Sequence, residues 1–178
     1  MRIVATPLAG VHTIEREPIS DDRGWFARTF DAAGFADAGL DLQVQQANAS
    51  FNARRGTLRG MHLQRAPHGE PKLVTCVRGA VWDVALDLRP DSPSFRAWHG
   101  VELGAAGGVG YFLPEGVAHG FLTLTDDAEV HYLMGHHFVP DAAAGVRWDD
   151  PAFGIDWPDL GIELTISAKD RAYADYTG

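Results

Sequence analysis

The stretch Leu58-Arg59-Gly60-Met61-His62-Leu63-Gln64 carries the strongest structural signal in this chain. A second stretch, Pro114-Glu115-Gly116-Val117-Ala118-His119-Gly120-Phe121, has the same character. Each stretch places one histidine near glycine in an apolar segment of β-forming residues. Two such segments are typical of facing strands in a small β-barrel with a polar pocket.

The two stretches resemble the paired sequence blocks of the cupin fold. A metal-binding cupin usually has His-x-His in its first block, because a first-row metal needs about three or four ligands. Here the second position of that pattern is Gln64. We therefore expect an all-β cupin or jelly-roll β-barrel with a few short helices, which kept a polar pocket and binds no metal and no cofactor.

Composition supports one soluble domain over residues 1–178. The chain is 46% hydrophobic and contains 20 glycines and 10 prolines, as expected for a fold with a buried core and many turns. The single cysteine, Cys76, excludes an internal disulfide and fits a reducing cytoplasm. The net charge of −9 disfavours nucleic acid and anionic membranes as partners. We find no apolar run suited to a signal peptide or a membrane span.

Strand-forming patterns predict strands at residues 11–16, 25–30, 42–51, 57–64, 72–77, 80–88, 95–103, 109–113, 120–125 and 129–138. Residues 72–77 and 80–88 should form a hairpin around Arg78-Gly79. Asp31 is a suitable N-cap for a short helix over residues 32–38, which Gly39 would close. The tail from about Trp157 has only weak signals, and we expect it to pack on the barrel.

Strand alternation places His62 on one face with Leu58, Gly60 and Gln64, and Arg59 on the opposite face with Met61 and Leu63. A single interior histidine is usually a hydrogen-bonded core residue. Lys72 at the start of the next strand changes this interpretation, because lysine is rarely buried without a role, although a strand-end lysine can also reach solvent. A histidine and a lysine in one pocket suit proton abstraction beside a carbonyl group.

Other polar residues have two readings each. His119 is either a structural histidine or a substrate contact, and Tyr132 is either a core tyrosine or an acid that returns a proton to carbon. Arg59 and Arg23 are either surface residues or phosphate contacts. The cluster of His131, His136 and His137 is more typical of flexible loops than of a metal site.

The assembled chain resembles the dTDP-4-dehydrorhamnose 3,5-epimerase family over nearly its whole length. Each matching segment is weak alone, but their order is that of the family. The segments are DRGWF (22–26), QANAS (46–50), GTLRGMHLQ (56–64), KLVTCVRG (72–79), DVALDLR (83–89), SPSF (92–95), PEGVAHGF (114–121), WDDP (148–151) and SAKD (167–170).

The resemblance implies a metal-free cupin-type barrel that epimerises C3 and/or C5 of a dTDP-4-keto-6-deoxyhexose. It also implies a homodimer with exchanged N-terminal strands. In such enzymes a His-Asp dyad is the base, which corresponds to His62 and Asp170. The lysine that stabilises the enolate corresponds to Lys72, and the tyrosine acid on the opposite sugar face corresponds to Tyr132.

The resemblance further implies a set of substrate-binding residues. Nucleotide contacts correspond to Arg59, Gln46 and Asn48, and a pocket histidine corresponds to His119. Contacts from the partner subunit correspond to Arg23 and Phe26.

Three positions depart from the family pattern. Arg28 replaces a common glutamate near the nucleotide site, Phe138 replaces a second pocket tyrosine, and Glu70 before Pro71 replaces a common glutamine. Because Phe138 lacks the phenol, ring positioning could differ. A 3- or 5-monoepimerase of a secondary-metabolite sugar pathway is therefore the main alternative.

Three further readings are less favoured. The presence of both His62 and Tyr132 favours epimerisation over sugar ketoisomerisation. Gln64 argues against a metal-dependent cupin oxygenase. A non-catalytic sugar-binding cupin would have no need for His62, Lys72, Tyr132 and Asp170 together.

Overall fold

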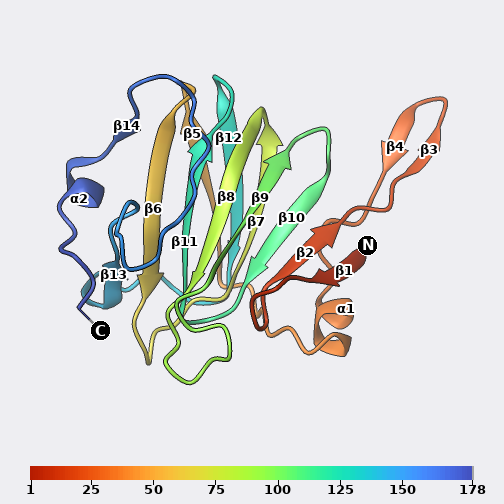
Figure 1. Ribbon diagram of the computed structural model, residues 1–178. Coiled ribbons are helices and arrows are strands. Elements are labelled where there is room, and N and C mark those ends of the chain that lie inside the picture. The colour runs from red at the N-terminus through yellow and green to blue at the C-terminus, as the bar shows by residue number, and fades with distance from the viewer. Residues whose placement is uncertain (178) are drawn as a thin grey trace.

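Two antiparallel sheets form the body of the computed structural model, which describes residues 1–177 (Figure 1). The first sheet has the order β1-β2-β10-β7-β12-β5, with β1 (Arg2–Ala5), β2 (His12–Glu15), β5 (Gln46–Asn52), β7 (Lys72–Arg78), β10 (Val109–Leu113) and β12 (Ala128–Met134). The second has the order β13-β6-β11-β8-β9, with β6 (Thr57–Gln64), β8 (Ala80–Asp87), β9 (Trp98–Gly104), β11 (Val117–Thr123) and β13 (Ala143–Gly145).

The remaining elements are short. The hairpin β3 (Ile19–Asp21) and β4 (Gly24–Phe26) stands apart from both sheets, and β14 (Thr165–Ile166) pairs in parallel with β6. Helices α1 (Ala32–Asp37) and α2 (Ala168–Arg171) and the 3-10 helix η1 (Pro140–Ala142) complete the described part of the chain. Neither α-helix in that part has the length and apolarity needed to cross a membrane.

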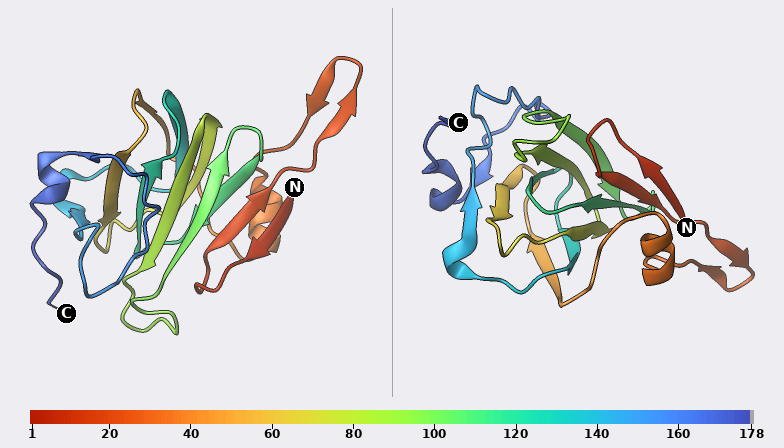
Figure 2. Two further views of the ribbon diagram at one scale, coloured as in Figure 1. Left: turned by 45° about the horizontal axis from the view of Figure 1, so that its top comes forward. Right: turned by 90° about the horizontal axis from the view of Figure 1, so that it is seen from below.

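The main core lies between the two sheets, which surround a common interior when seen from below (Figure 2). Val74, Tyr111 and Val130 enter it from the first sheet, and Val81 and Phe121 from the second. Burial of these side chains is the main favourable contribution to folding. This mostly stranded, two-layer architecture confirms the expected all-β fold.

The prediction that residues 72–77 and 80–88 form a hairpin is wrong. β7 pairs with β10 and β12, whereas β8 pairs with β9 and β11 in the other sheet. Gly79, with φ +70°, supplies the turn by which the chain passes between sheets. A short turn is compatible with either arrangement, so the local sequence could not separate the two.

The N-terminal strand predicted at residues 25–30 is also corrected. Only Gly24–Phe26 is extended as a strand, and it pairs with Ile19–Asp21 to form an arm that projects from the body (Figure 1). All six paired residues are exposed, including the apolar Ile19, Trp25 and Phe26. By contrast, the predicted helix is confirmed, with Asp31 accepting hydrogen bonds from the backbone N–H groups of Ala33 and Gly34.

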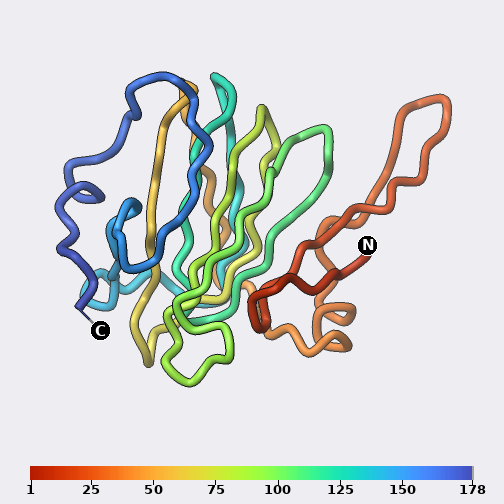
Figure 3. Tube along the Cα trace, viewed as in Figure 1, coloured from red at the N-terminus to blue at the C-terminus, as the bar shows by residue number. Residues whose placement is uncertain are grey.

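The C-terminal segment runs beside β6 and over the outer face of the second sheet (Figure 3). Its side chains Phe153, Trp157 and Tyr176 pack against a cluster that includes Val84 and Leu86 of β8. The tail therefore covers an apolar surface that would otherwise face solvent.

Candidate active site

A cavity of about 210 Å³ opens between the two sheets and collects most of the predicted polar residues. His62 and His119 come from the second sheet, and Lys72 and Tyr132 come from the first. These pairs of side chains therefore line opposite walls. The complete lining is Asn48, Arg59, His62, Glu70, Lys72, His119, Phe121, Tyr132 and Met134.

His62 and Asp170 form the shortest polar contact of the site. The carboxylate can only accept, so Nε2–H of His62 donates to Oδ1 of Asp170 over 2.6 Å, and Nδ1 keeps its lone pair. The Asp170 side chain is only 5% exposed, against 40% for His62. Partial burial lowers the pKa of His62 below its usual range, while the bond and charge of Asp170 oppose the shift. The neutral imidazole is thus favoured near neutral pH.

Asp170 reaches His62 through a gap at the edge of β6. β14 pairs with Thr57 and Leu58, β13 pairs with residues 62–64, and Met61 exchanges two backbone hydrogen bonds with Val146. Within residues 1–177, this leaves only Arg59 and Gly60 without a backbone partner on that side. Helix α2 lies at this gap, and Asp170 Oδ2 accepts from the Gly60 backbone N–H at 3.4 Å. Ser167 caps α2 by accepting from the Asp170 N–H at 3.0 Å. These contacts hold the carboxylate in place.

The face predicted for Arg59 is wrong, because β6 contains a bulge. His119 pairs with His62 but Phe121 pairs with Arg59, so β6 has one more residue than β11 between these pairs. The extra residue shifts the alternation, and Arg59 joins His62 in the cavity. Gly60, with φ +134°, makes the bulge possible: a Cβ there would lie 2.5 Å from the Gly120 Cα.

His119 forms a second His-carboxylate pair, which was not predicted from the sequence. Its Nε2 lies 2.9 Å from each carboxylate oxygen of Asp83, a fully buried residue on β8. Burial raises the pKa of Asp83, opposed by the charge of His119. The sequence signal that could have identified this pair is Asp83 itself, an acid on the inward-facing side of a strand with alternating apolar residues. Asp83 orients His119, whose ring centroid lies 6.0 Å from that of Tyr132.

Lys72 is buried and paired within the cavity. Its Nζ donates to Oε1 of Glu70 at 2.9 Å, and the two side chains are 5% and 11% exposed. Residue Lys72 is held between two strands by pairing with Leu113 of β10 and Met134 of β12. The pocket thus presents a fixed ammonium group with an adjacent carboxylate.

Tyr132 faces the cavity from β12. Its hydroxyl lies 3.3 Å from Ser50 Oγ, and burial raises its pKa to about 12. The phenol is therefore protonated at neutral pH. Arg59, in the same cavity, donates from Nε to Oδ1 of Asn52 at 2.7 Å. Within residues 1–177 its terminal NH₂ groups make no hydrogen bond, so they are available to an anion.

Gln46, Phe138 and Gln64 lie outside the cavity lining. Gln46 Oε1 accepts from the Phe138 N–H at 2.8 Å, while residue Phe138 is 61% exposed. Gln64 donates to the carbonyl groups of His68 and His137 and accepts from Val139 N–H. Gln64 therefore ties two loops together.

Arg23 and Phe26 lie on the projecting arm, and the structure does not bring them to the cavity of their own chain. Arg23 pairs with Asp21 across the tip of the arm. Arg28, one of the departures from the family pattern, pairs with the helix cap Asp31 at 2.6 Å. Arg23, Phe26 and Arg28 are all exposed.

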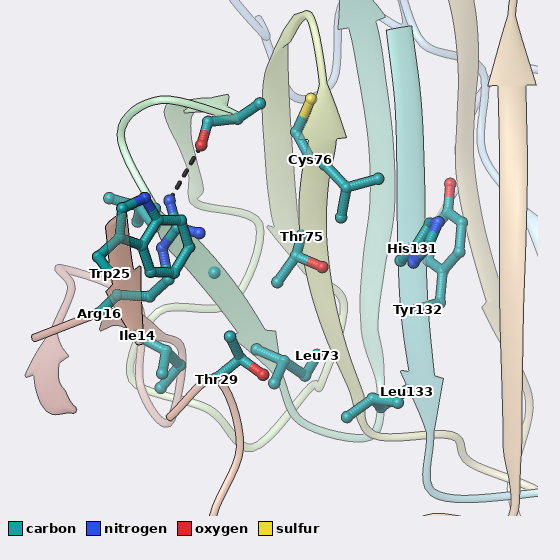
Figure 4. Close-up of a pocket in the computed structure, with 15 residues that line it drawn as sticks. Ile14, Arg16, Trp25, Thr29, Leu73, Thr75, Cys76, His131, Tyr132 and Leu133 are labelled. Atoms are coloured by element: carbon teal, nitrogen blue, oxygen red, sulfur yellow. Dashed lines mark hydrogen bonds between the residues drawn. The ribbon is translucent and has the colours of Figure 1, made fainter. Parts of the chain in front are cut away.

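A second cavity, of about 450 Å³, lies on the outer face of the first sheet (Figure 4). Its wall includes Arg16, whose guanidinium carbon lies 4.6 Å from the Trp25 ring centroid. The Arg16 side chain also donates to the Ala105 carbonyl at 2.9 Å. His131 lines this cavity and pairs with Glu129. In residues 1–177, no group of three His, Cys, Asp or Glu residues is arranged to hold a metal ion.

Comparison with known proteins gives a consistent result. The sequence profile of the dTDP-4-dehydrorhamnose 3,5-epimerase family matches residues 5–177. The Methanothermobacter thermautotrophicus dTDP-4-dehydrorhamnose 3,5-epimerase is 44% identical over 172 residues, covering 96% of this chain and 91% of the relative.

Solved structures agree in fold. The Elizabethkingia anophelis dTDP-4-dehydrorhamnose 3,5-epimerase superposes with a TM-score of 0.95 at 34% identity, over 99% of this chain and 96% of that one. ChmJ, a 3'-monoepimerase from Streptomyces bikiniensis solved with dTDP-quinovose, superposes with a TM-score of 0.89 at 36% identity. The superposition covers 97% of this chain and 86% of the ChmJ chain.

Proposed function

The chain belongs to the dTDP-4-dehydrorhamnose 3,5-epimerase family, and we propose that its inter-sheet cavity epimerises a dTDP-4-keto-6-deoxyhexose at C3, C5 or both. It is an isomerase of the cupin-type fold. The observation that carries the proposal is the placement of a His62–Asp170 pair and Tyr132 on opposite walls of one cavity.

The 4-keto group acidifies the hydrogens on C3 and C5, so a base can remove either proton. Neutral His62 is the proposed base, and Asp170 fixes its tautomer and stabilises its cation after proton transfer. Lys72 is the proposed partner of the enolate oxygen, where negative charge develops. Inversion then needs a proton from the other face, which Tyr132 can donate because its phenol is protonated.

The nucleotide is proposed to bind at the open side of the cavity. Arg59 has NH₂ groups that are unpaired within the described residues and suited to a diphosphate, and Asn48 lines the same cavity. Gln46 and Phe138, which hydrogen-bond to each other, would lie near the nucleotide or sugar. His119, oriented by Asp83, would contact the sugar.

We infer that the working unit is a homodimer in which each arm reaches the partner's cavity. The exposed apolar residues Ile19, Trp25 and Phe26 support this inference, because such residues are usually covered in an assembled protein. Arg23 on the same arm would then approach the substrate of the other subunit. The proposed chemistry uses side chains alone, and the buried thiol of Cys76 suits a reducing cytoplasm.

Monoepimerisation is the second candidate. It is favoured by Phe138, which lacks a phenol, and by the likeness to ChmJ, a 3'-monoepimerase. Incubation with dTDP-4-keto-6-deoxyglucose in heavy water, followed by NMR, tests both. Deuterium at C3 and C5 supports the 3,5-epimerase, deuterium at one carbon supports the monoepimerase, and none at either carbon excludes both.

A further inference from the structure

Glu70 places a carboxylate inside the cavity that the chemistry described above does not use. Its Oε1 lies 2.9 Å from Lys72 Nζ, and the two residues are separated only by Pro71. The Pro71 carbonyl accepts from the Gly135 N–H at 2.7 Å, which anchors the segment that carries Glu70. The carboxylate is therefore part of the cavity wall.

The burial of this ion pair is informative. Exposed charge pairs form on many protein surfaces with little effect, but both of these side chains are largely removed from solvent. Burying two charges has a desolvation cost that their attraction often does not exceed. Stability alone therefore gives a weak reason for the pair, and its position in the cavity suggests a role in the reaction.

The geometry of the ammonium group indicates what that role is. Lysine has a flexible four-carbon stem and three N–H donors. Within residues 1–177 the one hydrogen bond made by Lys72 Nζ is the bond to Glu70. That bond fixes the end of the stem and leaves two donors for a substrate oxygen in the cavity.

We propose that Glu70 is a positioning residue, which holds the Lys72 ammonium so that its remaining N–H groups meet the carbonyl oxygen on which the enolate charge develops. This inference rests on the proposed epimerase function. This positioning role requires a hydrogen-bond acceptor at the end of a side chain as long as that of glutamate. A negative charge at some other distance would not serve the same purpose.

Three substitutions test this requirement. Glu70→Gln keeps an acceptor oxygen at the same reach, so at least roughly a third of kcat should remain. Glu70→Asp keeps the charge but is shorter, and Glu70→Ala removes the acceptor. For Glu70→Ala, kcat should fall about 10- to 100-fold while KM changes less than about threefold, because misplacement of a catalytic group affects mainly the transition state. Glu70→Asp should lie between the alanine and glutamine variants.

A double variant separates positioning from a structural effect. If Glu70 acts through Lys72, then Glu70→Ala should cause no further loss of kcat in a Lys72→Ala background. Glu102→Ala, which removes an exposed carboxylate on β9, is the matched control and should retain wild-type kcat. The double variant also avoids leaving a buried lysine without its partner, so it remains informative if Glu70→Ala alone folds poorly.

The inference is overturned if Glu70→Asp and Glu70→Ala keep kcat within about twofold of wild type, if Glu70→Gln is as impaired as Glu70→Ala, or if the losses from Glu70→Ala and Lys72→Ala multiply. All rates are read as deuterium incorporation into dTDP-4-keto-6-deoxyglucose. Absence of exchange by the wild-type protein would instead refute the proposed function, so the two failures are distinguishable.

Discussion

His62 Nε2 lies 2.6 Å from Asp170 Oδ1, although 108 positions separate the two residues in the chain. The contact forms because α2 enters the unpaired edge of β6 at the bulge. It pairs a partly exposed imidazole with a buried carboxylate. If His62 is the base that we propose, Asp170 is the group that orients it.

Asp170→Asn should shift the pH dependence of the reaction. Partial burial lowers the pKa of His62, so kcat/KM of the wild type should stay high as pH falls and decline only below the usual histidine value of about 6.5. Asp170 raises that pKa through its bond and charge. Its neutralisation should move the acid limb to lower pH and reduce kcat by about two to four orders of magnitude. An acid limb at unchanged or higher pH contradicts this account, and exposed Asp159→Asn is the control.

His62→Ala should reduce turnover and spare dTDP binding, whereas Arg59→Ala should first weaken dTDP binding. Loss of the proposed base should remove nearly all turnover while dTDP still binds, because Arg59 remains in place. Loss of Arg59 should first weaken dTDP binding, by about 10- to 100-fold, since a charge-assisted phosphate contact is lost. Calorimetry with dTDP and the exchange assay measure the two effects. Near-normal turnover by His62→Ala would exclude it as the base.

Strand alternation identified His62 as a candidate for the pocket, and Lys72 was added because it starts the next strand. Tyr132 kept two readings until the family resemblance assigned it to the pocket. The same rule misplaced Arg59, because alternation assumes an unbroken strand and the bulge at Gly60 adds one residue. The glycine itself was visible, but its φ of +134° was not.

Long-range contacts account for the rest of what the sequence missed. Asp170 lies in a tail without clear periodicity, and only resemblance to a family assigned it. Asp83 is one of two acids on β8, with Asp87, and its role depends on His119 of the neighbouring strand β11. The pairing of β7 and β8 with different sheets depends on packing across the whole barrel, which a local turn does not encode.

Gly60→Ala should destabilise the fold. The φ of +134° is strained for any residue with a Cβ, and that Cβ would meet the Gly120 Cα at 2.5 Å. The free energy of unfolding should fall by about 2 to 4 kcal/mol in urea titrations at fixed protein concentration. Gly104→Ala is the control, because its nearest neighbours would lie 3.8 Å away. Equal stability of the two variants would show that the bulge tolerates a side chain.

Two inactive variants should complement each other if the arms are exchanged. His62→Ala lacks the base, and the double variant Arg23→Ala with Phe26→Ala lacks the arm contacts. In a mixed dimer, one site combines both defects and the other is intact. Random 1:1 association should therefore restore about a quarter of wild-type activity. Mass measurement should first show that the samples contain mixed dimers. If activity is then not restored, the arm contributes to the cavity of its own subunit or to no cavity.

Exchange at the two sugar carbons should proceed at unequal rates. Both reactions begin with proton loss to His62 and give enolates held by Lys72, so they differ in how the sugar ring is seated. Phe138 is 61% exposed and lacks a phenol that could hydrogen-bond to the ring. Deuterium should therefore enter the two carbons at clearly unequal rates, as measured by NMR over time. We expect C3 to lead, because it is the first carbon processed in the family that this chain resembles.

Substitution at position 138 tests the cause of that difference. Phe138→Tyr adds a hydroxyl without removing the ring, and the Gln46 contact, which uses backbone N–H, is retained. The ratio of the C3 and C5 rates should then move toward one. Phe51→Tyr makes the same change on an exposed ring of β5 and should leave the ratio unaltered. Equal rates at both carbons in the wild type would mean that Phe138 has no influence on ring seating.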